Sequence, residues 1–207
     1  GLLGKYVAFH NYRAGISAEY EGFADYTTQG GRPTSGYFPR FRNLHKQETD
    51  FLRGYAAGFS AGKYNYADQS GIGLSLKEQL LNPSKYGNWT VGSHMMGETI
   101  PKESNLVTLS KNEKDAWGIP LLSVHVEYDD NDEQMVKDYQ EQMTEMFEKA
   151  GFTNIRVRDD HRAPGLDIHE MGGVRMGKDP KTSLLNKNHQ LHACANVYVT
   201  DGACMTS

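Results

Sequence analysis

A change of hydrophobic period between residues 121 and 158 constrains the fold of this chain more than any other feature. In the stretch LLSVHVEY every second side chain is apolar, namely Leu122, Val124, Val126 and Tyr128. The intervening polar positions are Ser123, His125 and Glu127. A period of two is the signature of a half-buried strand, so we expect a strand with one apolar and one polar face.

A period of three to four residues follows directly. Asp130 or Asn131 can cap a helix and Gly151 can end it. The apolar positions between them are Met135, Tyr139, Met143, Met146, Phe147 and Ala150. Methionines in such a stripe are typical core filler. Because Ile155 and Val157 begin another strand, the stretch predicts a strand, a helix and a strand in one unit, with the helix on one sheet face.

The upstream part of the chain predicts further strands. Residues 1–50 are rich in Gly, Tyr and Arg without a sustained period, which favours irregular strands and long loops. Residues 89–98 and 104–110 read as strands separated by a turn that contains Pro101. We expect these two strands to pair as an antiparallel hairpin, with a turn-rich link over 111–120.

Two shorter features lie between these strands. Gly54, Gly58 and Gly62 are spaced by four residues, a pattern of either a closely packed face or a ligand contact. Residues 75–87, SLKEQLLNPSKYG, predict a short amphipathic helix that ends before Pro83.

Composition excludes several classes of protein. Lys and Arg number 22 against 26 Asp and Glu, with both signs interspersed, which argues against binding to a nucleic-acid backbone. No window approaches the roughly 20 apolar residues of a membrane helix, so we expect no membrane span. Cys194 and Cys204 form no zinc-type or redox pattern. Two cysteines do not distinguish a cytoplasmic from a periplasmic protein. Since the chain starts without Met and ends in DGACMTS, we expect a piece of a longer protein.

The motif HEMGGVRMGKDP, residues 169–180, is the strongest candidate site. A zinc site would need a second histidine where Gly173 stands, and a phosphate loop would need a lysine and a hydroxyl after its glycines. A histidine in a glycine-lined wall remains, with Gly172 and Gly173 allowing a flat ligand to approach. Arg175 can fix the loop through carbonyls or carboxylates, or compensate a negative group. A histidine beside a tight turn, without catalytic role, stays open as the alternative.

A second motif, ANVYVTDGA, ends the chain. Val197 to Val199 reads as a short buried strand that leads into Asp201 and Gly202. An acidic residue and a glycine in this position can bind a sugar-like hydroxyl and admit a phosphate or a ring. Most such pairs are ordinary turns.

Taken in order, these motifs resemble the C-terminal signature of the glucose-methanol-choline (GMC) oxidoreductases. The matching runs are His169 to Gly177, Asp179-Pro180, Thr182 to Leu184, Asn196 to Val199 and Asp201 to Ala203. Residues 97–109 and 114–120 also look like this family, particularly its gluconate-dehydrogenase-like branch. The resemblance covers residues 95–207 well and the first 90 residues loosely.

The resemblance implies an α+β fold, a largely antiparallel sheet with helices packed on one face, that forms the substrate domain of an FAD-dependent oxidoreductase. It implies that this domain covers residues 1–195 and that 196–207 begin the return to an FAD domain. His169 matches the catalytic histidine that assists proton removal while hydride passes to flavin N5. Asp201, Gly202 and Ala203 match the cofactor-binding motif. A sugar, sugar acid or polyol is the implied substrate, and no metal is implied.

The chain departs from the family pattern in two places. The N-terminal GxGxxG that grips FAD is not found in the sequence, and the second active-site His or Asn would lie downstream of Ser207. We therefore expect the isolated chain to retain FAD poorly and to be inactive, with the FAD domain as its partner. Two other functions stay open: a non-catalytic carbohydrate-binding domain, and an interaction domain for an electron-acceptor subunit.

Overall fold

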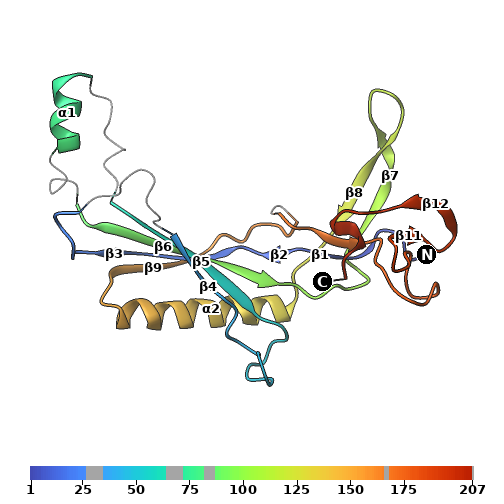
Figure 1. Cartoon of the computed structure of the whole chain (residues 1–207), viewed down its shortest axis with the longest axis horizontal. Helices are drawn as coiled ribbons and strands as arrows, with labels where there is room; N and C mark the ends of the chain where they lie inside the picture. Colours follow the sequence, from blue (N-terminus) through green and yellow to red (C-terminus); the bar gives the residue numbers. More distant parts are fainter. Residues whose placement is uncertain (27–34, 64–71, 82–86, 166–167, 207) are drawn as a thin grey trace. The chain divides into compact units, whose positions relative to one another are not determined.

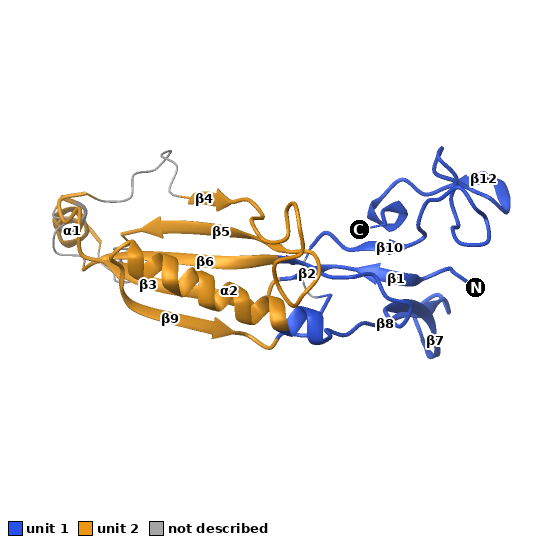
Figure 2. Ribbon diagram, turned by 90° about the horizontal axis from the view of Figure 1, so that it is seen from below, with its two compact units in different colours: residues 1–11, 97–133, 162–207 blue, residues 12–96, 134–161 orange. Residues whose placement is uncertain are grey.

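The computed structural model describes residues 1–26, 35–63, 72–81, 87–165 and 168–206. They form two compact units, each assembled from separate segments of the chain (Figure 2). Unit 1 comprises residues 1–11, 97–133 and 162–207, and unit 2 comprises 12–96 and 134–161.

Unit 2 is built on the sheet order β4-β5-β6-β3-β9 (Figure 1). Its elements are β3 (Ala14–Tyr20), β4 (Ser35–Phe38), β5 (Tyr55–Gly62), α1 (Leu74–Leu81), β6 (Trp89–Glu98), α2 (Asp130–Lys149) and β9 (Thr153–Asp159), of which α2 and β6 run into unit 1. Helix α2 lies along one face of this sheet (Figure 2). Strand β3 lies inside the sheet, because it pairs antiparallel with both β6 and the edge strand β9.

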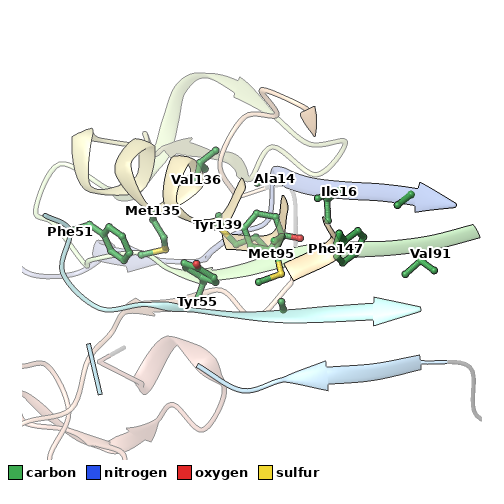
Figure 3. Close-up of a cluster of buried hydrophobic side chains, with 13 residues drawn as sticks. Ala14, Ile16, Phe51, Tyr55, Val91, Met95, Met135, Val136, Tyr139 and Phe147 are labelled. Atoms are coloured by element: carbon green, nitrogen blue, oxygen red, sulfur yellow. The ribbon is translucent and has the colours of Figure 1, made fainter. Parts of the chain in front are cut away.

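The core of unit 2 confirms the predicted helical stripe from Met135 to Phe147, whereas Ala150, which was expected to continue it, is exposed. Met135, Tyr139, Met143 and Phe147 are at most 2% exposed and pack against sheet residues such as Ile16 (Figure 3). Gly151 ends the helix as predicted, with a φ of 78° and a backbone bond from Gly151 N to Glu148 O. Burying this stripe stabilises the helix far more than its propensity does.

Unit 1 contains a smaller sheet in the order β10-β1-β7-β8 and a separate ribbon of two strands. Its elements are β1 (Lys5–Ala8), β2 (His10–Asn11), β7 (Leu106–Lys114), β8 (Pro120–His125), β10 (Met171–Gly173), β11 (Gln190–Leu191), β12 (Cys194–Tyr198) and the 3₁₀ turn η2 (Gly202–Cys204). Strand β2 pairs with the end of β6, His10 opposite Glu98 and Asn11 opposite Gly97. Strand pairing is mostly antiparallel, which confirms the α+β fold.

One strand pairing expected from the sequence is wrong. Strand β7 pairs with β8 and β1 and belongs to another sheet than β6, so residues 89–98 and 104–110 form no hairpin. The hairpin lies instead between β7 and β8, where the carboxylate of Asp115 accepts the backbone N–H groups of Trp117 and Ile119 and fixes the turn.

The predicted strand, helix and strand unit is also wrong. Strand β8 lies in the unit 1 sheet and β9 in the unit 2 sheet. Leu122 and Val124 are 70% and 58% exposed, so β8 has no buried apolar face. The strand expected over Val197 to Val199 is likewise exposed and ends at Tyr198.

The N-cap of α2 is Asp129 rather than Asp130 or Asn131. Its carboxylate accepts the N–H of Asn131 at 3.0 Å, and Asp132 Oδ2 in turn accepts the N–H of Asp129 at 3.0 Å. This reciprocal capping satisfies donors that the first helical turn leaves unpaired. Gly58 serves packing, because a Cβ there would meet the His94 ring at 2.5 Å.

Candidate functional site

The two sequence motifs are joined by backbone hydrogen bonds in unit 1. Val174 donates to the carbonyl oxygen of Ala203 and Met176 donates to that of Cys204, each over 3.0 Å. Asp201 caps the 3₁₀ turn through its carboxylate, which accepts the N–H of Ala203 at 3.0 Å. The segment after His169 and the Asp-Gly-Ala segment therefore form one local structure.

The glycines of this structure serve different purposes. Gly172 and Gly173 have φ values of 86° and 88°, where side chains are rarely tolerated. A Cβ on Gly172 would overlap the carbonyl oxygen of Tyr6, and a Cβ on Gly202 would lie 2.5 Å from that of Glu170. The absence of a side chain at Gly172 and Gly202 thus allows the backbone of Tyr6 and of Glu170, respectively, to approach closely. A Cβ on Gly173 would make ordinary van der Waals contact with Gly4, whose Cα lies 3.7 Å away, so at this position the positive φ rather than a lack of room requires glycine.

An open groove of 870 Å³ runs along this structure. Residues 170–174 and 201–203, which include three glycines, form part of its lining. Leu3, Leu109 and Leu122 form an apolar part of its lining. Predominantly apolar walls with a few polar groups are typical of sites for organic ligands. Asp201, Gly202 and Ala203 all lie on the groove, whereas His169 immediately precedes its lining residue Glu170.

His169 pairs with a histidine that the sequence did not single out. His169 Nδ1 lies 3.0 Å from His10 Nε2, and the two rings meet edge to face at 84° with centroids 5.1 Å apart. His169 is exposed and has a φ of 66°, an uncommon backbone conformation for a side-chain-bearing residue. Such local strain is often held at functional positions.

Buried neighbours hold His10 in place. Phe9 is 3% exposed and exchanges two hydrogen bonds with Thr99, whose Oγ1 accepts from Phe9 N at 3.1 Å and donates to Phe9 O at 2.6 Å. Asn11 is fully buried and its Nδ2 donates to the carbonyl oxygen of Asp132 at 3.2 Å. Because the residues on both sides of His10 are anchored, its backbone is fixed, and so is the direction in which its side chain leaves the backbone.

Arg175 fixes its own loop, as one of its two expected roles predicts. Its Nε donates to the carbonyl oxygen of Thr182 at 3.1 Å, and its guanidinium lies 3.9 Å from the ring centroid of Tyr6. This second contact is a cation–π interaction. Arg175 therefore ties the motif to β1.

The clearest electrostatic perturbation in unit 1 lies at the start of α2. Burial raises the pKa of Asp132 to about 7, and the nearby charge of Asp129 adds to this. Burial also opposes ionisation of Asp129, but the hydrogen bond and charge of Lys102 outweigh it and lower its pKa. Asp132 is 2% exposed, so the loss of hydration of its ionised form accounts for the direction, with the charge of Asp129 as a smaller contribution.

Comparison with known sequences identifies the family. Residues 101–207, just over half of the chain, match the GMC oxidoreductase family. The chain belongs to this family, whose members are generally FAD-dependent.

Three characterised relatives are similar to this chain. The 2-methyl-1,2-propanediol dehydrogenase of Mycolicibacterium austroafricanum is 29% identical over the whole chain and 38% of its own length. The fructose dehydrogenase large subunit of Gluconobacter japonicus is 25% identical over the whole chain and 37% of its own length. The paromamine 6'-oxidase of Streptomyces fradiae is 31% identical over 51% of the chain and 19% of its own length.

The chain thus spans well under half the length of these relatives. Within the described residues, no helix is long and apolar enough to cross a membrane. The gluconate-dehydrogenase-like branch stays a prediction.

Proposed function

We propose that this chain is the substrate domain of an FAD-dependent oxidoreductase that oxidises a CH–OH group of a sugar, sugar acid or polyol. The observation that carries the proposal is the position of His169, whose Nδ1 is engaged by His10 and which directly precedes Glu170, where the lining of the groove shared by the two family motifs begins. Membership of the GMC family and the names of the relatives support the reaction class. In this proposal residues 1–195 form the substrate domain and 196–207 return to the FAD domain.

The groove residues fit a flat organic cofactor. Its volume falls within the roughly 300–1,000 Å³ of ordinary ligand sites, and Gly172, Gly173 and Gly202 line it without side chains. Asp201, Gly202 and Ala203 would hold part of FAD along one wall, and Leu109 and Leu122 would cover an apolar part of it. When bound, FAD supplies the acceptor for the hydride of the alcohol carbon.

His169 assists removal of the hydroxyl proton. Among the described residues no hydrogen bond engages its Nε2, so this atom is free to meet a substrate hydroxyl, while Nδ1 is occupied by His10. Imidazole suits this task because it changes protonation near neutral pH. Removing the proton raises the electron density on oxygen and thereby favours loss of hydride from the adjacent carbon.

Kinetics of variants in the complete open reading frame test the proposal. His169→Ala is expected to lower kcat for sugar or polyol oxidation about 100-fold or more, the usual scale of a lost general base. His45→Ala changes an exposed histidine of unit 2 and serves as the matched control with unchanged kcat. Retention of wild-type kcat by His169→Ala would contradict the assignment.

The 207-residue chain alone provides a second measurement. We expect it to show no oxidation of sugars with an artificial electron acceptor and added FAD, because groups beyond these residues are needed. Turnover by the isolated chain would refute this part of the proposal. Sugar binding that survives His169→Ala, with no oxidation by the complete protein, would instead establish a carbohydrate-binding domain. A stable complex with an electron-acceptor subunit but no oxidation would establish an interaction domain.

A further inference from the structure

We propose that His10 is the positioning residue of His169, accepting the Nδ1–H of His169 at its own Nε2 so that Nε2 of His169 is directed to the substrate as the proton acceptor. The inference deepens the proposed function and rests on the proton-accepting role given there to His169. It is carried by the 3.0 Å separation of the two nitrogens and by their edge-to-face ring arrangement.

A hydrogen bond between two imidazoles holds one proton between two nitrogens. If His10 Nε2–H donates, a neutral His169 carries its own proton on Nε2 and cannot accept another there. If His169 Nδ1–H donates, Nε2 of His169 has a free lone pair. Only the second arrangement gives a base on the atom that faces away from His10.

The same arrangement balances the proton during reaction. The substrate O–H bond breaks and its proton forms a bond to His169 Nε2, which leaves His169 with protons on both nitrogens. Its Nδ1–H then points at the lone pair of neutral His10 Nε2 and makes a charge-assisted hydrogen bond. His10 neither gains nor loses a proton, and acts by stabilising and orienting the protonated His169, as the third member of a catalytic triad does.

The surroundings of His10 suit a fixed acceptor. Its neighbours Phe9 and Asn11 are almost completely buried, and its β2 backbone pairs with β6. The carboxylates nearest in the chain and sheet are Glu98, opposite His10 in the β6 register, and Glu170, next to His169. Both remain in every variant used below, so differences between variants report on the His10 ring.

Nitrogen-15 NMR of the 207-residue chain reads the tautomer directly. We expect His169 to be protonated at Nδ1 when neutral, with a coupling across the hydrogen bond to His10 Nε2. His10→Gln keeps an amide oxygen that accepts from Nδ1–H and is expected to retain this tautomer. His10→Leu removes the acceptor and is expected to move the proton to Nε2. Amide spectra of both variants verify that unit 1 is folded.

Kinetics of the complete protein give the second readout. His10→Leu is expected to lower kcat about 10- to 100-fold with KM changed less than about twofold, and His10→Gln to recover most of this loss. The double variant His10→Leu/His169→Ala is expected to be no slower than His169→Ala alone, because both act in one unit. An unchanged tautomer and kcat in His10→Leu would overturn the role of His10, whereas wild-type kcat in His169→Ala would overturn the proposed function itself.

Discussion

The phenol of Tyr55 donates a hydrogen bond to Asp138 Oδ2 over 2.7 Å, and the same carboxylate receives both Nε and Nη2 of Arg42 at 2.9 and 2.7 Å. Tyr55 is 1% exposed and lies in the core of unit 2. Burial, and next the bond to Asp138, raise the pKa of its hydroxyl. One carboxylate of α2 therefore satisfies two polar groups at the edge of the core.

Asp138→Ala is expected to destabilise the chain more than Tyr55→Phe. Removing the phenol hydroxyl costs about 1 kcal/mol, because Asp138 keeps Arg42. Removing the carboxylate costs about 2–4 kcal/mol, because it leaves a buried hydroxyl and a guanidinium without their acceptor. Urea unfolding measures both free energies, with the exposed α2 residue Glu141→Ala as control. Equal costs for the two variants would contradict a shared carboxylate.

Gly172→Ala is expected to destabilise the chain by about 2–4 kcal/mol. The substitution adds left-handed backbone strain of about 1–2 kcal/mol and an overlap with the carbonyl oxygen of Tyr6. Gly118→Ala has a similar φ, 82°, with no atom within 4 Å of the added Cβ, so it reports the strain alone. Thermal or urea unfolding of both variants separates the cost of backbone strain from the cost of the overlap. Equal losses of stability in Gly172→Ala and Gly118→Ala would show that β1 shifts to accommodate the methyl group.

The wild-type chain is expected to become less stable as the pH rises from about 4 to about 7. Asp132→Asn is expected to abolish this decrease. The pKa of Asp132 is about 7 in the folded chain, above the ordinary value of about 4 for an unfolded aspartate. As pH rises through this interval the unfolded chain releases the proton while the folded chain keeps it, so unfolding becomes easier by a few kcal/mol. Below pH 4 both states are protonated, and above pH 7 both are ionised.

The measurement is urea unfolding at a series of pH values. The gap in unfolding free energy between Asp132→Asn and the wild type is expected to shift in favour of the variant from pH 4 to pH 7 and then to stay constant. Asp130→Asn changes an exposed aspartate in the same helical turn and serves as control. A constant gap for Asp132→Asn would show that its carboxyl ionises as easily as an exposed one.

Local patterns predicted local structure well. The apolar period from Met135 to Phe147 located both the helix and its buried face, because a helix repeats every 3.6 residues along the chain. Strand partners were predicted poorly. Val91 pairs with Ala18 and Lys5 with Gly173, and no local period encodes such distant choices.

In the candidate site, too, the sequence indicated residues within a local motif but not their partners from distant parts of the chain. The order of residues in the motif singled out His169 and Asp201 to Ala203, and their roles stay predictions. His10 carried no signal of its own, since one histidine among eight in an irregular stretch is unremarkable by spacing. The pairing of β2 with β6 places it, and that contact exists only in the folded chain.

The division of the chain into interleaved segments affects its synthesis. Unit 1 combines residues 1–11 with 97–133 and 162–207, so Lys5 pairs with Gly173, a residue far away in the sequence. During translation β1 leaves the ribosome long before β10, so the edge that pairs with β10 stays unpaired until residues 171–173 have been made, and unpaired strand edges are prone to aggregation. Slow, late folding of unit 1 follows from its connectivity, since contacts between distant residues form slowly.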